Sequence, residues 1–250
     1  MQESLKRAVH WIEEHRPRRI AALTGAGISA ESGIPTFRDA GGLWESYRAE
    51  ELATPQAFAK DPALVWRWYE WRRGLIRDAV PNDGHLALAS LEDVLGRRGG
   101  TFTLITQNVD GLHRRAGSRS VIELHGNIFR VRCTREGNAV ERTESFAELP
   151  PRCACGALLR PDVVWFGEML PSGAIETASA AVADADLLLV IGTSGVVHPA
   201  AGLVSMLRHG GAIEVNPQET AITRLVTVAI QGPASGALPA LADAVERSLG

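Results

Sequence analysis

Short apolar runs alternate with amphipathic stretches along most of the chain. The segments Ile20–Thr24 and Leu187–Ile191 are almost wholly apolar, which is typical of strands inside a parallel sheet. Further strands are predicted at 101–106, 121–124, 163–166, 212–215 and 226–230, and helices before Pro17 and at 85–95, 175–185, 200–209 and 238–249. This alternation predicts an α/β fold, a Rossmann-like parallel sheet with helices on both faces.

Two stretches break the alternation. Residues 41 to about 81 are rich in tryptophan and other aromatic residues at helical spacing, without a strand pattern. Residues 129–160 are polar, weakly periodic and contain all three cysteines. We therefore expect a single domain over 1–250, with a Rossmann-like core at 1–40, 84–128 and 161–250, a helical insertion at 41–83 and a small cysteine-bearing, zinc-ribbon-like module at 129–160.

A glycine-rich turn, GAGISAESGIPTFR, follows the first predicted strand. Gly25 and Gly27 allow a sharp turn and a close approach to a ligand. Ser29 is predicted to cap a following helix, whose free N–H groups would face a phosphate. Ala30 stands where a dinucleotide-binding GxGxxG motif has its third glycine, a position that tolerates alanine. The turn therefore indicates a nucleotide site.

Polar residues also follow other predicted strands. In TQNVDGLH, Asn108 and Asp110 are placed for a ligand, or alternatively form an Asx-turn that satisfies nearby backbone N–H groups. His125 also follows a strand, and histidine can take up a proton near neutral pH. A structural histidine is the alternative, and it is the role that we expect for His85 and His113.

Three later strands also end in small or polar residues. The three segments are Gly192-Thr193-Ser194, Asn216-Pro217-Gln218 and Gly232-Pro233-Ala234. Each could be only a turn, but the carboxyl ends of parallel strands meet at one edge of a sheet, where α/β proteins bind ligands. We expect these segments to contact a phosphate, a ribose and an adenine in that order.

The three cysteines indicate a metal site rather than a disulfide framework, because their number is odd and they are clustered. Cys133, Cys153 and Cys155 could supply thiolates to a structural Zn²⁺. Glu136 stands where the second thiolate of a CxxC pair would be, and a carboxylate can also bind zinc. The alternative is a metal-free module with three reduced cysteines.

The segments GAGISAESGIPTFR and TQNVDGLH, with Leu124-His125-Gly126, resemble the signatures of the sirtuins, the NAD-dependent protein-lysine deacylases. The resemblance runs from about Arg18 to Leu241. It implies that NAD is a co-substrate and that nicotinamide leaves as the amide oxygen of an acyl-lysine protein or peptide attacks the ribose. The acyl group would then move to a ribose hydroxyl that the base deprotonates. The products would be free lysine and 2′-O-acyl-ADP-ribose. The cysteine pairs depart from the family pattern, whose first pair is CxxC and whose second pair is one residue longer.

The resemblance also implies the site residues. His125 would be the catalytic base, Asn108 would act beside it at the nicotinamide, and Phe37 would screen the reactive carbon. NAD would be bound by Gly25, Ala26, Gly27, Ser29, Ala30, Ile34, Phe37, Arg38, Gln107, Asn108, Asp110, Gly192, Thr193, Ser194, Asn216, Pro217, Gln218 and Ala234. The peptide would add as an extended strand beside Val164-Trp165-Phe166.

Tyr69 and Arg72 are spaced to share one face of a predicted helix. With Ala53 earlier in the chain, they resemble the sirtuin class that removes succinyl, malonyl and glutaryl groups. Arginine offers paired donors to a carboxylate, tyrosine adds a hydroxyl, and alanine leaves room. The alternatives are a core tyrosine with a solvated arginine, and a general deacetylase without preference for acidic acyl groups.

Composition, charge and the absence of other motifs reduce the number of possible partners and function classes. The formal net charge is −3 and the basic residues are scattered, so nothing favours nucleic-acid or membrane partners. The first fifteen residues lack the apolar core of a signal peptide, which predicts a cytoplasmic protein. An NAD oxidoreductase would need an acidic residue about twenty positions after the glycine-rich turn, for which no clear strand exists. A non-catalytic NAD sensor would not need His125, Asn108 and Asp110 together.

Overall fold

The computed structural model describes residues 1–36, 43–44 and 47–250. Its centre is a six-stranded parallel sheet with the strand order β11-β10-β9-β1-β4-β5. The strands are β1 (Arg19–Thr24), β4 (Thr101–Thr106), β5 (Val121–Glu123), β9 (Leu187–Ile191), β10 (Gly211–Asn216) and β11 (Val228–Gln231). The predicted Rossmann-like α/β fold is thereby confirmed.

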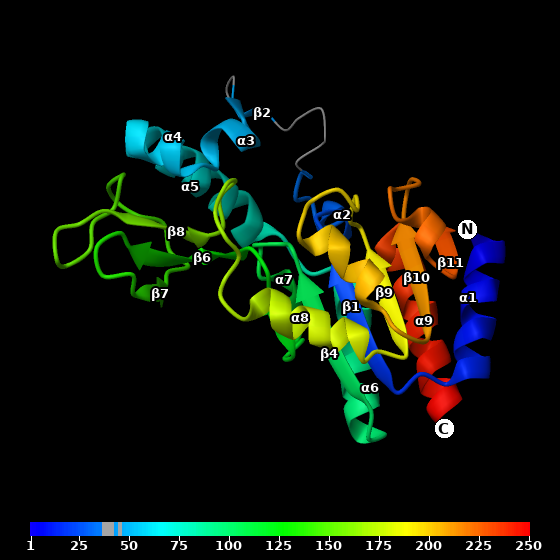
Figure 1. Ribbon diagram of the computed structural model, residues 1–250. Coiled ribbons are helices and arrows are strands. Elements are labelled where there is room, and N and C mark those ends of the chain that lie inside the picture. Colours follow the sequence, from blue (N-terminus) through cyan, green and yellow to red (C-terminus); the bar gives the residue numbers. More distant parts are fainter. Residues whose placement is uncertain (37–42, 45–46) are drawn as a thin grey trace.

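Helices cover both faces of this sheet (Figure 1). Successive strand residues point to opposite faces, so Ala22 and Leu189 face one apolar core, and Leu23 and Val190 face the other. The first core is covered by α1 (Gln2–His15), α6 (Asp83–Arg97) and α9 (Ala234–Leu249), and the second by α8 (Ala174–Ala183) and the 3₁₀ helix η1 (Ala200–Met206). Apolar strands are stable here because both of their faces are buried.

The strand order reverses beside β1. From β1 the chain adds β4 and β5 on one side, and then crosses to β9, β10 and β11 on the other. The carboxyl ends of β1 and β9 therefore form a topological switch point, where open α/β sheets bind ligands. The short helices α2 (Gly27–Ala30) and α7 (Leu112–Arg115) follow β1 and β4 at this edge.

A third apolar core joins the two insertions beside the sheet (Figure 1). Here α3 (Ala49–Leu52), α4 (Pro55–Lys60) and α5 (Pro62–Asp78) pack against an antiparallel sheet of β6 (Gly126–Cys133), β7 (Ala139–Glu141) and β8 (Leu159–Val163). The buried Trp66 donates from Nε1 to the carbonyl of Leu159 over 2.8 Å. The fully buried Arg73 donates to the carbonyls of Ile128 and Arg142. These contacts make the two insertions one packed unit.

Several predicted elements differ in kind or extent from the observed ones. The predicted strand at 163–166 is wrong, because β8 ends at Val163 and the next residues bond outside a sheet. The insertion at 41–83 contains a small hairpin as well as helices. Three observed elements were not predicted: β2 (Leu43–Trp44), β3 (Tyr47–Arg48) and the 3₁₀ helix η2 (Thr223–Leu225). Three predicted helices differ from the observed ones: the helix over 200–209 is the shorter η1, α6 continues through Gly96, and α9 begins at Ala234. Helix ends depend on local caps that apolar periodicity does not report. Within 1–36, 43–44 and 47–250, no helix is both long and apolar enough to cross a membrane.

Candidate active site

The turns that follow β1 and β9 are in direct backbone contact at the switch point. The N–H of Gly25 donates to the carbonyl of Ile191, and that of Gly27 to the carbonyl of Gly192, each over 2.9 Å. Gly192 has φ of +58°, and a Cβ atom there would lie 2.4 Å from the nitrogen of Ile28. This close approach requires glycine, because any larger residue would separate the two turns.

Polar side chains from further strand ends meet at the same point. Gln107, after β4, donates from Nε2 to Oγ1 of Thr193, after β9, over 3.0 Å. Asn216, at the end of β10, donates from Nδ2 to the carbonyl of Thr193 over 3.2 Å. The sheet thus brings into contact residues that we predicted for one ligand.

Ser29 links the glycine-rich turn to the turn after β4. Its buried Oγ donates to Oδ2 of Asp110 over 2.8 Å and accepts from Nδ2 of Asn108 over 3.2 Å. Ser29 is not the predicted helix cap, because α2 starts after Ala26 and Ser29 lies within it. Asp110 also makes the Asx-type bond that we considered, accepting from the N–H of Leu112. Burial raises the pKa of Asp110, although these hydrogen bonds partly oppose the shift.

His125 is half-buried and is held in one orientation. Its Nδ1 lies 2.9 Å from the carbonyl oxygen of Gln107. A carbonyl can only accept, so Nδ1 carries the proton and Nε2 keeps its lone pair. Burial lowers the pKa of His125 below 6.5, although the bond to Gln107 partly offsets the shift. The ring is therefore neutral near pH 7 and can accept a proton.

A buried polar network behind the site was not predicted from the sequence. Oγ1 of Thr24 lies 2.9 Å from both Oγ1 of Thr106 and Nε2 of His113. The rings of His113 and His85 lie 4.9 Å apart between centroids. Burial lowers the pKa of His85 to about 4 and that of His113 to about 3, so both stay neutral at physiological pH. Their burial agrees with the structural role that we expected, but no spacing in the sequence pairs them.

The residues predicted to contact the acyl chain gather around Trp165. Tyr69, on α5, is 3% exposed, and its hydroxyl accepts a hydrogen bond from Nε1 of Trp165 over 2.9 Å. Ala53 contacts the residue after Trp165, because its carbonyl accepts a hydrogen bond from the N–H of Phe166 over 2.9 Å. The tyrosine is thus a core residue, as one alternative had it, but its hydroxyl has a defined polar partner.

Arg72 lies between this group and the turn after β4. Its guanidinium is 5.5 Å from the ring centroid of Trp68, and the residue lies beside Ile34 and Pro35. Burial lowers the pKa of Arg72, while its interactions with neighbours including Asp110 partly oppose the shift. A shielded cation therefore lies within electrostatic reach of Asp110.

The backbone at 164–166 is occupied by contacts within the chain. Its three N–H groups donate, in order, to the carbonyl of His125, to Oε2 of Glu168 and to the carbonyl of Ala53, each over 2.9 Å. The strand edge that we predicted here therefore has no N–H left for a peptide. The same bonds place this segment between the histidine and α3.

The remaining predicted NAD residues are spread along the same edge. Ala26, Ile34, Ser194 and Pro217 lie on the segments after β1, β9 and β10, Ala234 begins α9 after β11, and Ala30 and Gln218 are exposed. Phe37 and Arg38 lie outside the described residues.

The cysteines and one carboxylate form a compact cluster at the end of β6. The ligand atoms of Cys133, Glu136, Cys153 and Cys155 all lie within 4.8 Å of one another. The N–H of Glu136 donates to the sulfur of Cys133, which lowers the pKa of that thiol and favours the thiolate that zinc binds. Three sulfurs and one carboxylate oxygen fit a tetrahedral structural zinc ion, which would hold the two turns of the module together.

We expect about one zinc ion per purified chain, and a lower melting temperature after chelation. Glu136→Ala should weaken zinc retention, because it removes one of the four ligands. Glu141→Ala is the matched control, since that carboxylate is exposed on β7, outside the cluster. Metal analysis that finds no zinc in folded, active protein would establish the metal-free alternative.

Comparison with known proteins agrees with this geometry. Residues 25–199 match the model of the Sir2 family. NAD-dependent protein deacylase 2 of Pyrobaculum aerophilum is 54% identical over 235 residues, 93% of each chain. An NAD-dependent protein deacylase of Thermus thermophilus is 51% identical over 255 residues, 99% of each chain.

Solved structures give the same result. A crystal structure of a Sir2 homologue in complex with NAD superposes with a TM-score of 0.88 at 48% identity, over 98% of this chain and 95% of that one. A Sir2 complex with a deacetylated p53 peptide and 3′-O-acetyl ADP ribose gives 0.84 at 32% identity, over 96% and 97%. The chain belongs to the Sir2 family. It is an NAD-dependent protein deacylase, and NAD is its co-substrate.

Proposed function

We propose that this deacylase removes succinyl and malonyl groups, as well as acetyl groups, from lysine side chains. The observation that carries the proposal is the Arg72 guanidinium, shielded on α5 and within electrostatic reach of Asp110. An acyl carboxylate that enters this region loses its water, at a cost that only a cation can offset. Arg72 can donate two parallel hydrogen bonds to it. The Tyr69 hydroxyl, which accepts from Trp165, retains its own proton to donate.

The acyl-lysine peptide is proposed to lie along 164–166, with Ala53 leaving room for the acyl chain. Because the N–H groups of 164–166 are used, we expect recognition through carbonyls and through side chains such as Phe166, which is 50% exposed. The Sir2 complex with a deacetylated p53 peptide supports a peptide site in this fold. Backbone-based recognition would tolerate many peptide sequences.

NAD is proposed to bind at the switch point, in contact with the residues that the sequence resemblance assigned. The turns at Gly27 and Gly192 would approach the phosphates, Asn216 the ribose, and Asn108 and Asp110 the nicotinamide. The Sir2 complex with NAD supports an NAD site in this fold. We also propose that the core at 1–40, 84–128 and 161–250 carries NAD, and that the two insertions, which share one apolar core, act as a single lobe over it.

His125 is proposed to be the general base, with Nε2 as the basic atom. The bond from Nδ1 to Gln107 fixes the tautomer, and the lowered pKa keeps the ring neutral. In this role Nε2 takes the proton of a ribose hydroxyl, so that the ribose oxygen can receive the acyl group. The zinc cluster takes no part in this step.

The pH dependence of kcat/KM should reflect this base. A protonated imidazole cannot accept a proton, so activity is lost as the pH falls through the pKa of His125. Burial lowers that pKa, so the acid midpoint should lie below 6.5. Nicotinamide release measured with an acetylated peptide across about pH 5 to 9 tests this, since the acetyl group does not titrate. An acid midpoint above 6.5 would contradict the assignment.

Two peptides that differ only in the acyl group test the proposed preference. We expect kcat/KM for the succinyl-lysine peptide to equal or exceed that for the acetyl-lysine peptide at saturating NAD. A strong preference for acetyl-lysine would instead establish the alternative, a general deacetylase without acidic-acyl preference.

A further inference from the structure

Arg160, the second residue of β8, holds the Trp165 ring from one side. The guanidinium carbon lies 3.4 Å from the ring centroid, and the arginine side chain is 11% exposed. Arg160 also pairs with both carboxylate oxygens of Glu168, over 2.6 and 2.9 Å, and donates to the carbonyl of Val163 over 3.0 Å. A cation with this many partners has one preferred position.

Glu168 holds the backbone of the same tryptophan. Its Oε2 accepts from the N–H of Trp165 over 2.9 Å. Burial alone would raise the pKa of Glu168, but hydrogen bonds from Arg160 and from this N–H lower it. The Arg160–Glu168 pair therefore stays ionised at neutral pH and fixes Trp165 through both its ring and its backbone.

Trp165 also contacts Tyr69, through the nitrogen of its ring. The indole Nε1–H donates to the phenol oxygen over 2.9 Å, and both residues are almost fully buried. Because the phenol oxygen accepts this bond, its own proton must point in another direction. The direction in which Tyr69 can donate thus depends on where the indole lies.

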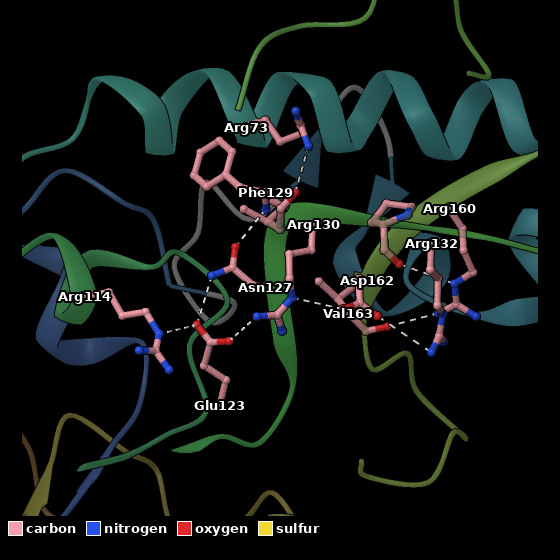
Figure 2. Close-up of polar contacts among 12 residues, drawn as sticks. Arg73, Arg114, Glu123, Asn127, Phe129, Arg130, Arg132, Arg160, Asp162 and Val163 are labelled. Carbon is pink, nitrogen blue, oxygen red and sulfur yellow. Dashed lines mark hydrogen bonds and ion pairs between the residues drawn. The ribbon is translucent and has the colours of Figure 1, made fainter. Parts of the chain in front are cut away.

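A row of charged side chains runs across β6 and β8 from Glu123 to Arg132, beside Arg160 (Figure 2). Glu123, on β5, pairs with Arg130 over 2.8 Å, and Arg130 pairs with Asp162 over 3.0 Å. Arg132 then lies 3.8 Å from Asp162 and 3.9 Å from Glu168. The row connects the edge of the central sheet, just before the predicted base, to the pair that holds Trp165.

We propose that Arg160 is a positioning residue for the acyl site, which fixes Trp165 and thereby directs the Tyr69 hydroxyl toward the acyl group. The inference rests on the proposed placement of Tyr69 at that site. Arg160 touches no reacting atom and acts through the indole. Losing a correctly directed neutral hydrogen bond corresponds to about a 3- to 10-fold loss in kcat/KM.

A double-mutant cycle tests whether Arg160 acts on the acyl group through the Tyr69 hydroxyl. Arg160→Met and Tyr69→Phe are each expected to lower kcat/KM for the succinyl-lysine peptide about 3- to 10-fold. The double variant should lose no more than the worse single variant, because both changes remove the same hydroxyl contact. Kd for NAD should stay unchanged in all three variants. Losses that multiply in the double variant would overturn the proposal.

The indole N–H of Trp165 gives a second readout that needs no substrate. Its NMR signal, assigned by its loss in Trp165→Phe, should be protected from hydrogen exchange in the wild type and lose protection in Arg160→Met. The exchange of the indole signals of the other five tryptophans should not change in this variant. Arg160→Lys, which keeps a cation over the ring, should restore part of the protection.

Controls separate positioning from loss of folding. Arg152→Met removes a cation of the same module that bonds to Gly156, and it should change neither readout. If Arg160→Met does not fold, Glu168→Gln removes the charge of the pair at unchanged size and should show the same loss of protection. An indole signal that stays protected in both variants overturns the proposal. A strong wild-type preference for the acetyl peptide would overturn the acidic-acyl preference instead, and the hydrogen exchange of the Trp165 indole would still decide the role of Arg160.

Discussion

His125→Ala should reduce turnover by about 10²- to 10⁴-fold, the usual effect of losing a general base. The structure gives this residue the properties that the role requires. The bond from Nδ1 to the Gln107 carbonyl leaves Nε2 as the basic atom, and the lowered pKa keeps it unprotonated at neutral pH. NAD affinity should be nearly unchanged, since the proposed NAD contacts come mainly from the turns after β1, β4, β9 and β10. Single-turnover formation of deacylated peptide and NAD binding, measured on the same preparations, separate the two effects.

His125→Tyr should behave in the same way, because phenol is a far weaker base than imidazole at neutral pH. His209→Ala is the matched control, since His209 is exposed and lies beyond η1. Retention of near-wild-type deacylation by His125→Ala would exclude His125 as the base.

Arg72→Met should reduce kcat/KM for a succinyl-lysine peptide by roughly 10- to 200-fold, with little change or a rise for the acetyl-lysine peptide. The range corresponds to losing a charged hydrogen bond of about 1.5–3 kcal/mol. Methionine keeps an unbranched apolar side chain on α5 but removes the donors and the cation over Trp68. A substrate with a carboxylate gains from those donors and an acetyl substrate does not, so the ratio of the two kcat/KM values is the informative quantity.

Two further variants on α5 help to interpret the result for Arg72→Met. Tyr69→Phe should act in the same direction but more weakly, because it removes a neutral donor. Arg67→Met is the matched control, since Arg67 is exposed on the same helix. If Arg72→Met lowers both rates equally, Arg72 is only structural and the enzyme is a general deacetylase.

The sequence was sufficient for the central sheet because its strands are short, apolar and buried on both faces. Leu187–Ile191 is predicted and observed with the same bounds, and Ile20–Thr24 needs only Arg19 added. The meeting of Gln107 with Thr193 also follows from the sequence, since the carboxyl ends of parallel strands share one edge. The zinc cluster follows from the spacing of thiols and carboxylate.

Other features depend on contacts between distant segments, which periodicity cannot report. Val164–Phe166 reads as an apolar strand, yet its N–H groups bond to segments on either side of it. Ser29 was predicted as a cap, but the fold brings Asp110 to its hydroxyl. The stacking of Arg160 on Trp165 likewise depends on how the chain turns after β8. Such residues gather around the candidate site, where tertiary contacts override local preference.

A product analysis of the wild-type protein with NAD and an acyl-lysine peptide tests directly whether the protein is an NAD-dependent deacylase. We expect nicotinamide, deacylated peptide and O-acyl-ADP-ribose in equal amounts, each formed only when both substrates are present. Mass spectrometry resolves all three products in one reaction. Formation of NADH, or binding of NAD without its consumption, would show that the protein is not a deacylase.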